Sequence, residues 1–198
     1  MTVRQAALLV SGALVMWAST ALAYCPTQDT ARKGFVLVAP EDRARIEVKP
    51  STDDIVSLDL FVGGQLMTSP TYYRGLYLIR VVAGHDTTSA AYDFDYLKEP
   101  EPTVGYHKMY HITLTQPDGK ATTDTIDSRI VSREALTVGD CTLDTLVFES
   151  QVAFPDRPMQ TRHTHYSPLL RTFVRESIAN DGSPPTWLIY DHIEPLSR

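Results

Sequence analysis

Hydrophobic and polar residues alternate with a period of two along much of the chain from residue 35 onward. Such alternation is typical of β-strands, because successive side chains of a strand point to opposite faces of a sheet. Glycine, proline, asparagine and aspartate separate the alternating segments, and these residues favour turns. Strands are predicted at 35–38, 46–48, 55–62, 65–68, 76–82, 90–97, 106–115, 121–131, 143–154, 159–166, 171–178 and 186–193. Helical periodicity is scarce, and one helical turn is expected at 132–136.

Short turns join neighbouring strands. The segment 116–120 reads Gln-Pro-Asp-Gly-Lys, in which proline presets the first turn position and glycine tolerates a positive φ. Gly63 and Gly64 indicate a second tight hairpin. Consecutive strands with short connections favour antiparallel pairing, whereas parallel strands need long crossovers. The sequence therefore predicts a single all-β, mainly antiparallel domain over 24–198: a curved sheet, half-barrel or sandwich with few or no helices.

The first 23 residues have the features of a secretory signal peptide. Arg4 places a positive charge near the amino terminus, an apolar run follows at 6–17, and Ala21-Leu22-Ala23 supplies the small residues of a cleavage site. The apolar run is shorter than the roughly 20 residues that a membrane-spanning helix needs. We expect cleavage after Ala23 and a soluble mature chain that is periplasmic or secreted, with no stable membrane insertion.

The two cysteines, Cys25 and Cys141, both follow the predicted cleavage site. Exported proteins meet an oxidising environment, so a single disulfide is the simplest use of this pair. A lipid-modified Cys25 would need a small residue immediately before it, and Tyr24 occupies that position. A redox role would favour a Cys-x-x-Cys pair, which the sequence lacks. We therefore predict a structural disulfide.

Composition and charge narrow the function classes. The 198 residues are 43% hydrophobic and 21% charged, which excludes a collagen, a low-complexity linker and a disordered acidic tail. Lysine and arginine number 18 against 24 aspartates and glutamates, which gives a formal net charge of −6. This acidity argues against a nucleic-acid partner or an anionic membrane surface.

Two segments of the carboxy-terminal half carry a family resemblance: Val138-Gly139-Asp140-Cys141-Thr142-Leu143-Asp144, and Tyr166-Ser167-Pro168-Leu169-Leu170 after the next hairpin. With the strands around them, over roughly 60 residues, they resemble uncharacterised exported β-sheet proteins of Gram-negative bacteria. More distantly, the pattern is similar to the LolA/LolB lipoprotein-carrier architecture. The resemblance implies a curved antiparallel sheet whose apolar concave side holds an acyl chain or a partner segment. The carriers close that cavity with helices, whereas this chain has few helix candidates.

His163 and His165 form a candidate metal site. Two residues apart on a strand, they face the same way at roughly 6.5 to 7 Å, so both imidazoles can bind one divalent metal ion if a third ligand is present. His107 and His111 lie roughly 13 Å apart on their own strand, so at most one of them can join the pair. The alternative is that His163 and His165 lie on a solvated strand face. No other cofactor is predicted.

Asp93 and Asp95 form an Asp-x-Asp pair that can bind a divalent cation, and paired carboxylates also suit glycoside hydrolysis. The neighbours Tyr92, Phe94 and Tyr96 explain the same pattern without chemistry, because they point into the core and leave the aspartates in solvent. Motifs of serine nucleophiles, zinc proteases, phosphate-binding loops and dinucleotide-binding loops are absent from the sequence. No catalytic residue is therefore predicted, and an enzyme is the less favoured class.

Aromatic residues gather at Tyr72, Tyr73, Arg74 and Tyr77. Tyrosine and arginine are enriched at interface centres, where they bury a large area and keep a polar end satisfied. We interpret this group as a candidate binding edge. The alternative is a loop whose rings pack on the sheet.

These observations predict a non-catalytic exported protein that presents a curved β-sheet or its edge to a hydrophobic small molecule or an envelope protein. One alternative is a metal-binding protein or metal-dependent enzyme that uses His163 and His165. The other is a structural component of the cell envelope.

Overall fold

The structure, a computed structural model, describes residues 24–51 and 54–197. Across these two ranges, thirteen antiparallel strands form a single sheet, and helices are limited to three short turns. The all-β prediction is therefore confirmed. No helix within the same ranges is long and apolar enough to cross a membrane. The predicted signal peptide, residues 1–23, lies outside the described residues.

The elements follow one another with short connections, as the turn signals predict. The strands are β1 (Phe35–Val38), β2 (Ala44–Val48), β3 (Ile55–Val62), β4 (Gln65–Tyr73), β5 (Tyr77–Ala83), β6 (Asp86–Tyr92), β7 (His107–Thr115), β8 (Ala121–Val138), β9 (Cys141–Ala153), β10 (Gln160–Ser167), β11 (Thr172–Asn180), β12 (Thr186–Ile189) and β13 (His192–Pro195). The short helices are α1 (Gln28–Ala31), η1 (Pro40–Asp42) and η2 (Tyr96–Lys98).

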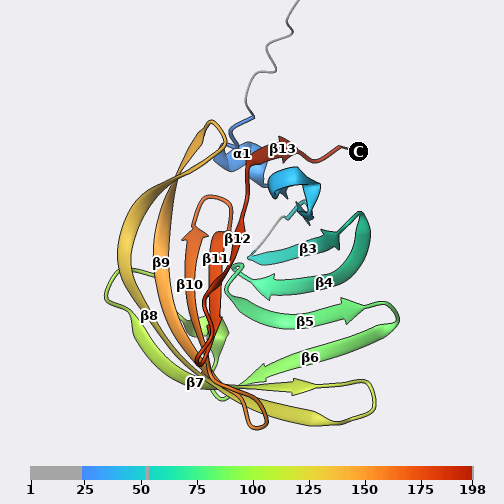
Figure 1. The fold of residues 1–198 in the computed structure, drawn as a ribbon, viewed down its shortest axis with the longest axis vertical. Helices are drawn as coiled ribbons and strands as arrows, with labels where there is room; N and C mark the ends of the chain where they lie inside the picture. Colours follow the sequence, from blue (N-terminus) through green and yellow to red (C-terminus); the bar gives the residue numbers. More distant parts are fainter. Residues whose placement is uncertain (1–23, 52–53, 198) are drawn as a thin grey trace, which may run out of the picture.

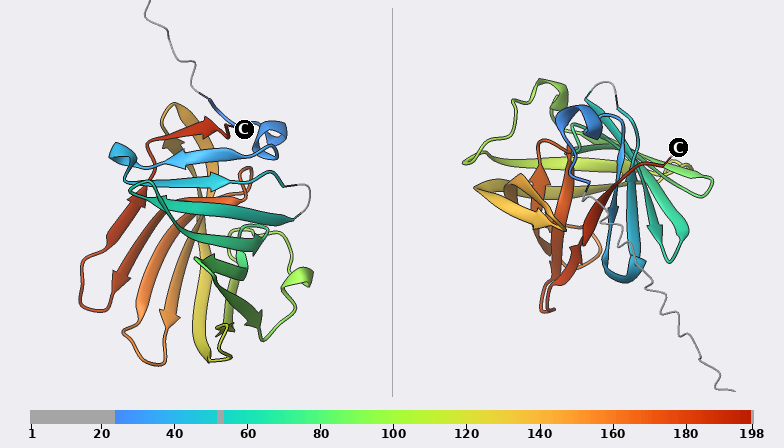
Figure 2. Two further views of the ribbon diagram at one scale, coloured as in Figure 1. Left: turned by 90° about the vertical axis from the view of Figure 1, so that its right-hand side faces the viewer. Right: turned by 90° about the horizontal axis from the view of Figure 1, so that it is seen from above.

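The sheet follows the chain from β1 to β12, each strand pairing with its sequence neighbours, and β13 then pairs with the free side of β1. Figure 1 shows β8–β12 running upright and β3–β6 lying crosswise to them. The turned views in Figure 2 show the same arrangement. Twisted sheets of many strands curl instead of staying flat, which brings the two ends of this sheet face to face. We call β1–β6 with β13 the first half, and β8–β12 the second half.

A buried cluster, here called the closed core, holds the two halves together. Phe35 and Leu37 of β1 are fully buried, and all four residues of this strand are apolar. Such continuous apolar runs are typical of strands that are covered on both faces. The buried members of the closed core are Phe35, Leu37, Ala39, Val48, Val56, Leu58, Val138, Cys141, Leu143, Leu170, Val174, Tyr190 and Ile193. Residues from both halves thus share one interior.

A disulfide fastens the amino-terminal segment to the closed core. Cys25 and Cys141 are bonded, with their Cα atoms 5.3 Å apart, and the predicted bridge is confirmed. Cys141 begins β9 and is buried, whereas Cys25 lies just before α1. The bond spans 116 residues of sequence, so it joins the start of the described chain to the second half of the sheet.

A contact between two turns, here called the seam, also joins the halves. Gly75 lies in the turn between β4 and β5 with a φ of +71°, a conformation that favours glycine. A Cβ atom at this position would lie 1.7 Å from the carbonyl oxygen of Arg171, in the turn between β10 and β11. The Tyr166 hydroxyl donates to the carbonyl oxygen of Arg74 at 2.6 Å across the same contact. The two turns are therefore packed backbone against backbone.

Three segments differ from the expected elements. Residues 132–136 are not a helical turn but part of β8, because each of them pairs with a residue of β9. The strand expected over 90–97 ends with β6, because the side chain of Asp95 accepts a backbone hydrogen bond at 3.2 Å and starts η2. The strand expected over 186–193 divides into β12 and β13, because its first part pairs with β11 and its second with β1.

Candidate functional site

A pocket of about 250 Å³ lies between the two halves of the sheet and borders the closed core. One wall comes from β2–β5, and the facing wall comes from β11, β12 and the residues that follow β12. Its apolar lining residues are Ile46, Leu58, Leu60, Pro70, Val81, Phe173 and Leu188, and its polar ones are Thr68, Tyr72, Thr172, Arg175, Glu176 and Tyr190. We call this space the interior pocket.

The strand register explains why Glu176 faces the interior pocket. Glu176 of β11 lies directly opposite Leu188 of β12 and Thr164 of β10. Residues that are paired in this way point to the same face of a sheet. Leu188 lines the pocket and Thr164 is buried, so the three side chains share the inner face. On the opposite face, the Arg175 guanidinium lies 4.7 Å from the ring centre of Trp187.

The carboxylate of Glu176 is unpaired. Within the described ranges, no basic group lies within 4.0 Å of it, and no group donates a hydrogen bond to it. Burial raises the pKa of Glu176, and the charge of Arg162 offsets this rise only in part. Arg162 Nη2 donates to Oε1 of Gln160 at 2.9 Å, and its Nε is buried without a hydrogen-bond partner among the described residues, so this guanidinium makes no ion pair with Glu176. The interior pocket therefore contains an acid without a protein partner.

Two tyrosines complete the polar part of the interior pocket. Burial, followed by the charge of Glu176, raises the pKa of Tyr72 to about 12. The same two causes raise the pKa of Tyr190. Both phenols stay protonated at neutral pH, so each can donate or accept a hydrogen bond. The pocket thus combines apolar walls with one acid, Arg175 and four hydroxyl-bearing residues, two of them tyrosines.

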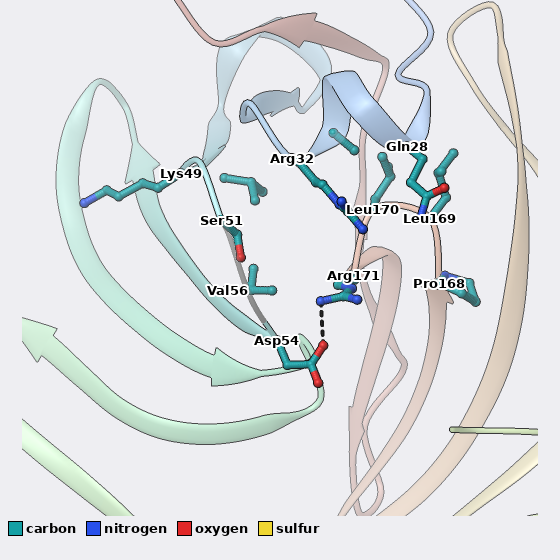
Figure 3. Close-up of a pocket in the computed structure, with 12 residues that line it drawn as sticks. Gln28, Arg32, Lys49, Ser51, Asp54, Val56, Pro168, Leu169, Leu170 and Arg171 are labelled. Atoms are coloured by element: carbon teal, nitrogen blue, oxygen red, sulfur yellow. Dashed lines mark hydrogen bonds and ion pairs between the residues drawn. The ribbon is translucent and has the colours of Figure 1, made fainter. Parts of the chain in front are cut away.

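A second pocket, of about 330 Å³, lies next to α1 and is shown in Figure 3. In this pocket the Arg171 guanidinium points toward Asp54, and its Nη1 donates to Asp54 Oδ1 at 2.8 Å. The other carboxylate oxygen of Asp54 accepts from Arg74 Nε at 3.2 Å. Burial raises the pKa of Asp54, but the two arginines lower it below its ordinary value. Because Asp54 links both turns of the seam, we interpret this pocket as part of that structural contact.

The aromatic group predicted as a binding edge lies inside the sheet. Both β4 and β5 are paired on each side, so their hairpin is not an edge. Tyr72 lines the interior pocket, whereas Tyr73 packs on Tyr96 with ring centres 5.6 Å apart. Tyr77 stacks on the same Tyr96 ring at 5.8 Å. Arg74 belongs to the seam. This placement agrees with the alternative interpretation, in which the aromatic rings pack on the sheet. Of the four residues predicted as a binding edge, Tyr72 lines the interior pocket.

The histidines predicted as metal ligands lie on the outer face of β10, in a groove of about 540 Å³. His163 Nδ1 is 3.7 Å from Glu149 Oε1, and His165 Nδ1 is 3.5 Å from Thr145 Oγ1. Burial and the charge of Arg175 lower the pKa of His165. In residues 24–51 and 54–197, no three His, Cys, Asp or Glu side chains are grouped so as to hold a metal ion. The metal site stays a prediction that lacks a third ligand.

The remaining candidate ligands form local pairs. His107 Nε2 lies 2.6 Å from Asp127 Oδ1, and His111 Nδ1 lies 2.7 Å from Asp93 Oδ2. The carboxylate of Asp95 pairs at 2.8 Å with the lysine three residues later. Asp93 and Asp95 are therefore engaged by different partners.

Sequence reasoning missed Glu176, although a signal was present. Val174, Glu176 and Ile178 recur with a period of two in a predicted strand, so the acid lies in phase with two apolar residues. An acid in a core position is informative, because charged groups are rarely buried without a partner. The sequence does not show which residues form the opposite wall, since β2–β5 lie much earlier in the chain.

Comparison with known proteins finds structural likeness at low sequence identity. No protein-family model and no curated protein sequence matches the chain. The hypothetical lipoprotein YmcC from Escherichia coli is similar with a TM-score of 0.48 and 9% identity, over 82% of this chain and 87% of that one. A Bacteroides fragilis protein described as exported and YmcC-like in fold is similar with a TM-score of 0.46 and 10% identity, over 81% of this chain and 94% of that one. The similarity to the LolA/LolB carriers stays a prediction.

Proposed function

We propose that this protein is an exported, non-catalytic binding protein that holds a small hydrophobic ligand in the interior pocket. The observation that carries the proposal is the lining of this pocket. Its walls include aliphatic and aromatic side chains, and its polar lining consists of one acid, one arginine, two tyrosines and two threonines. Ligand sites in proteins typically combine such apolar walls with a few polar groups that fix the orientation of the ligand.

The size of the interior pocket favours a small ligand. Sites for drug-sized molecules occupy about 300 to 1,000 Å³, and this pocket occupies about 250 Å³. A single short acyl chain or a compact aromatic molecule is of suitable size. Either would cover the apolar surfaces of Leu60, Val81 and Phe173, and removal of apolar surface from water is the main favourable contribution to such binding.

A hydrophobic fluorescent probe tests the binding proposal. N-phenyl-1-naphthylamine is neutral, and its fluorescence increases in apolar surroundings. We expect it to bind the mature protein at a single site. Val81→Phe fills part of the interior pocket and should weaken binding about tenfold or more. The same change at Val131→Phe, on the outer face where this side chain is 40% exposed, should leave the affinity within about twofold.

The two variants decide whether the probe occupies the interior pocket. Equal weakening in both variants, or in neither, would place the probe elsewhere and contradict the proposal. Circular dichroism and urea unfolding of each variant establish that the fold is retained before the affinities are compared. A wild-type protein that does not bind the probe at all would favour protein–protein interaction over carriage of a small ligand.

Export is the second part of the proposal, and it is supported by the residues before Tyr24 and by the disulfide. Disulfides persist mainly in oxidising compartments. Native mass spectrometry of the protein recovered from the periplasm of a Gram-negative host should give a chain that begins at Tyr24 with Cys25 and Cys141 bonded. A recovered chain that begins at Met1 would contradict this part. Any mass retained above that of the chain would report the ligand itself.

A further inference from the structure

The charges around Glu176 leave its carboxylate without a counterion. From β10, Arg162 is the basic residue that acts on it, and the guanidinium lies beyond 4.0 Å and donates to Gln160. From β4, Tyr72 contributes a neutral phenol, and Tyr190 after β12 contributes another. Arg175 also lines the pocket, but its guanidinium lies 4.7 Å from the ring centre of Trp187. Within the described ranges, neither arginine comes within 4.0 Å of the Glu176 carboxylate.

The acids on the outer surface provide the contrast. Asp127 and Asp93 each lie within 2.7 Å of a histidine nitrogen, and Asp144 accepts from Arg133 Nε at 2.8 Å. Solvent stabilises these exposed carboxylates even without a partner, whereas a buried carboxylate needs a partner much more. Glu176 is half-buried in the pocket, so its unpaired carboxylate is less well solvated than these surface acids. Such positions are commonly retained for ligand binding.

The chemistry of a carboxylate limits what can bind it. An ionised carboxylate only accepts hydrogen bonds, so a ligand must bring a donor. An anionic head group would be repelled. A neutral hydroxyl donor would satisfy one lone pair and leave the charge uncompensated, whereas an ammonium group supplies both the donors and the opposite charge.

We infer that the interior pocket binds an apolar ligand that carries a protonated amine, with the amine at the Glu176 carboxylate and the apolar body against Leu60, Val81 and Phe173. This inference rests on the proposed function, since it specifies the ligand class of the same pocket. Tyr72 and Tyr190 also line the pocket, and their neutral hydroxyls can accept the remaining ammonium hydrogens.

Displacement of N-phenyl-1-naphthylamine by three matched eight-carbon ligands tests the inference. n-Octylamine, n-octanol and octanoate share one apolar chain and differ in the head group. For the mature wild-type protein, we expect octylamine to bind about tenfold or more tightly than octanol, and octanoate to bind most weakly. In Glu176→Gln, octylamine and octanol should bind with similar affinity. Glu134→Gln, on the outer face, should keep the wild-type preference.

The outcomes separate the ligand class from the proposed function. If the probe binds wild type but octylamine shows no advantage over octanol, the amine inference is wrong while the binding function stands. An octylamine preference that persists in Glu176→Gln would also overturn it, because the amine would then sit elsewhere. If the probe does not bind wild type, the proposed function itself fails, and this inference fails with it. Probe binding by Glu176→Gln shows that the pocket of this variant is intact.

Discussion

The closed core and the interior pocket are neighbours between the same two halves of the sheet, and they share Leu58 and Tyr190. They are nevertheless built differently. In the closed core, Phe35 and Leu37 are fully buried, and one buried member, Cys141, is disulfide-bonded to Cys25. In the interior pocket, a space of about 250 Å³ remains, and Glu176 faces it without a partner.

This difference indicates how stability and binding are divided in the molecule. The closed core, the disulfide and the seam supply packing and cross-links, so changes there should destabilise the fold. The interior pocket contains an unpaired acid, and its charge destabilises the folded protein. Replacing Glu176 with a neutral residue should therefore stabilise the fold. Proteins often lose stability at sites that are used for binding. We therefore expect substitutions in the closed core and the seam to lower the free energy of unfolding, and the neutralisation of Glu176 to raise it.

Removal of the disulfide should give the largest loss. The bond closes a segment of 116 residues, and the chain-entropy treatment assigns such a loop up to about 5 kcal/mol. Cys25→Ser combined with Cys141→Ser should lower the Tm by roughly 10 °C, measured by calorimetry. The reduced wild-type protein should show the same Tm as the double variant, whose own Tm a reductant should not change. A wild-type Tm that is insensitive to reductant would contradict this part of the comparison.

A methyl group at Gly75 should give the next largest loss. The added Cβ would overlap the Arg171 carbonyl oxygen, and the φ of +71° strains any residue with a side chain. We expect Gly75→Ala to lower the free energy of unfolding by about 3 kcal/mol, measured by urea unfolding. Gly119→Ala is the matched control, because its φ is +83° and, beyond its chain neighbours, no atom lies within 4 Å of the place its methyl group would occupy. Its loss should be about 1 kcal/mol, and equal losses would mean that the seam is not tightly packed.

Most of the fold could be predicted from the sequence because strand signals are local. Alternation and turn residues identified the hairpins, and two cysteines allow one intramolecular pairing. The pairing of β13 with β1 could not be predicted, because the segment 192–195 is short and its partner lies at the other end of the described chain. The helical turn expected at 132–136 was wrong, because these residues pair with β9 and extend β8.

Less of the candidate site could be predicted, because a binding pocket depends on which faces meet. Tyr72 was identified for its residue type, but the bulge between Thr71 and Tyr72 shifts the register and makes the face of the ring hard to assign from alternation. His163 and His165 share a face, as their spacing predicts, but that face is the outer one. The alternation in β11 predicts that Glu176 faces the same side as Val174 and Ile178. The sequence does not show that this side faces a pocket, because the opposite wall comes from β2–β5.

The smallest expected effect is a gain in stability at the interior pocket. Burial gives the folded protein a higher Glu176 pKa than an unfolded chain has, so the folded state binds more protons between the two pKa values. The free energy of unfolding therefore falls as the pH rises through that interval. Glu176→Gln cannot ionise, and it should be more stable than wild type at pH 7 by about 1 kcal/mol. Below the ordinary glutamate pKa of 4.5, the two side chains are both neutral and the difference should vanish.

Urea unfolding at pH 7 and at about pH 3.5 measures this change, and Glu134→Gln provides the control. Glu134 is exposed and accepts from the Ser132 hydroxyl at 2.7 Å, so its replacement should change stability little at either pH. A Glu176→Gln protein that is no more stable than wild type at pH 7 would mean that the fold accommodates this acid as well as it does the surface acids. The interior pocket would then resemble the closed core in its energetics, and the Glu176 carboxylate would have no need of a ligand amine.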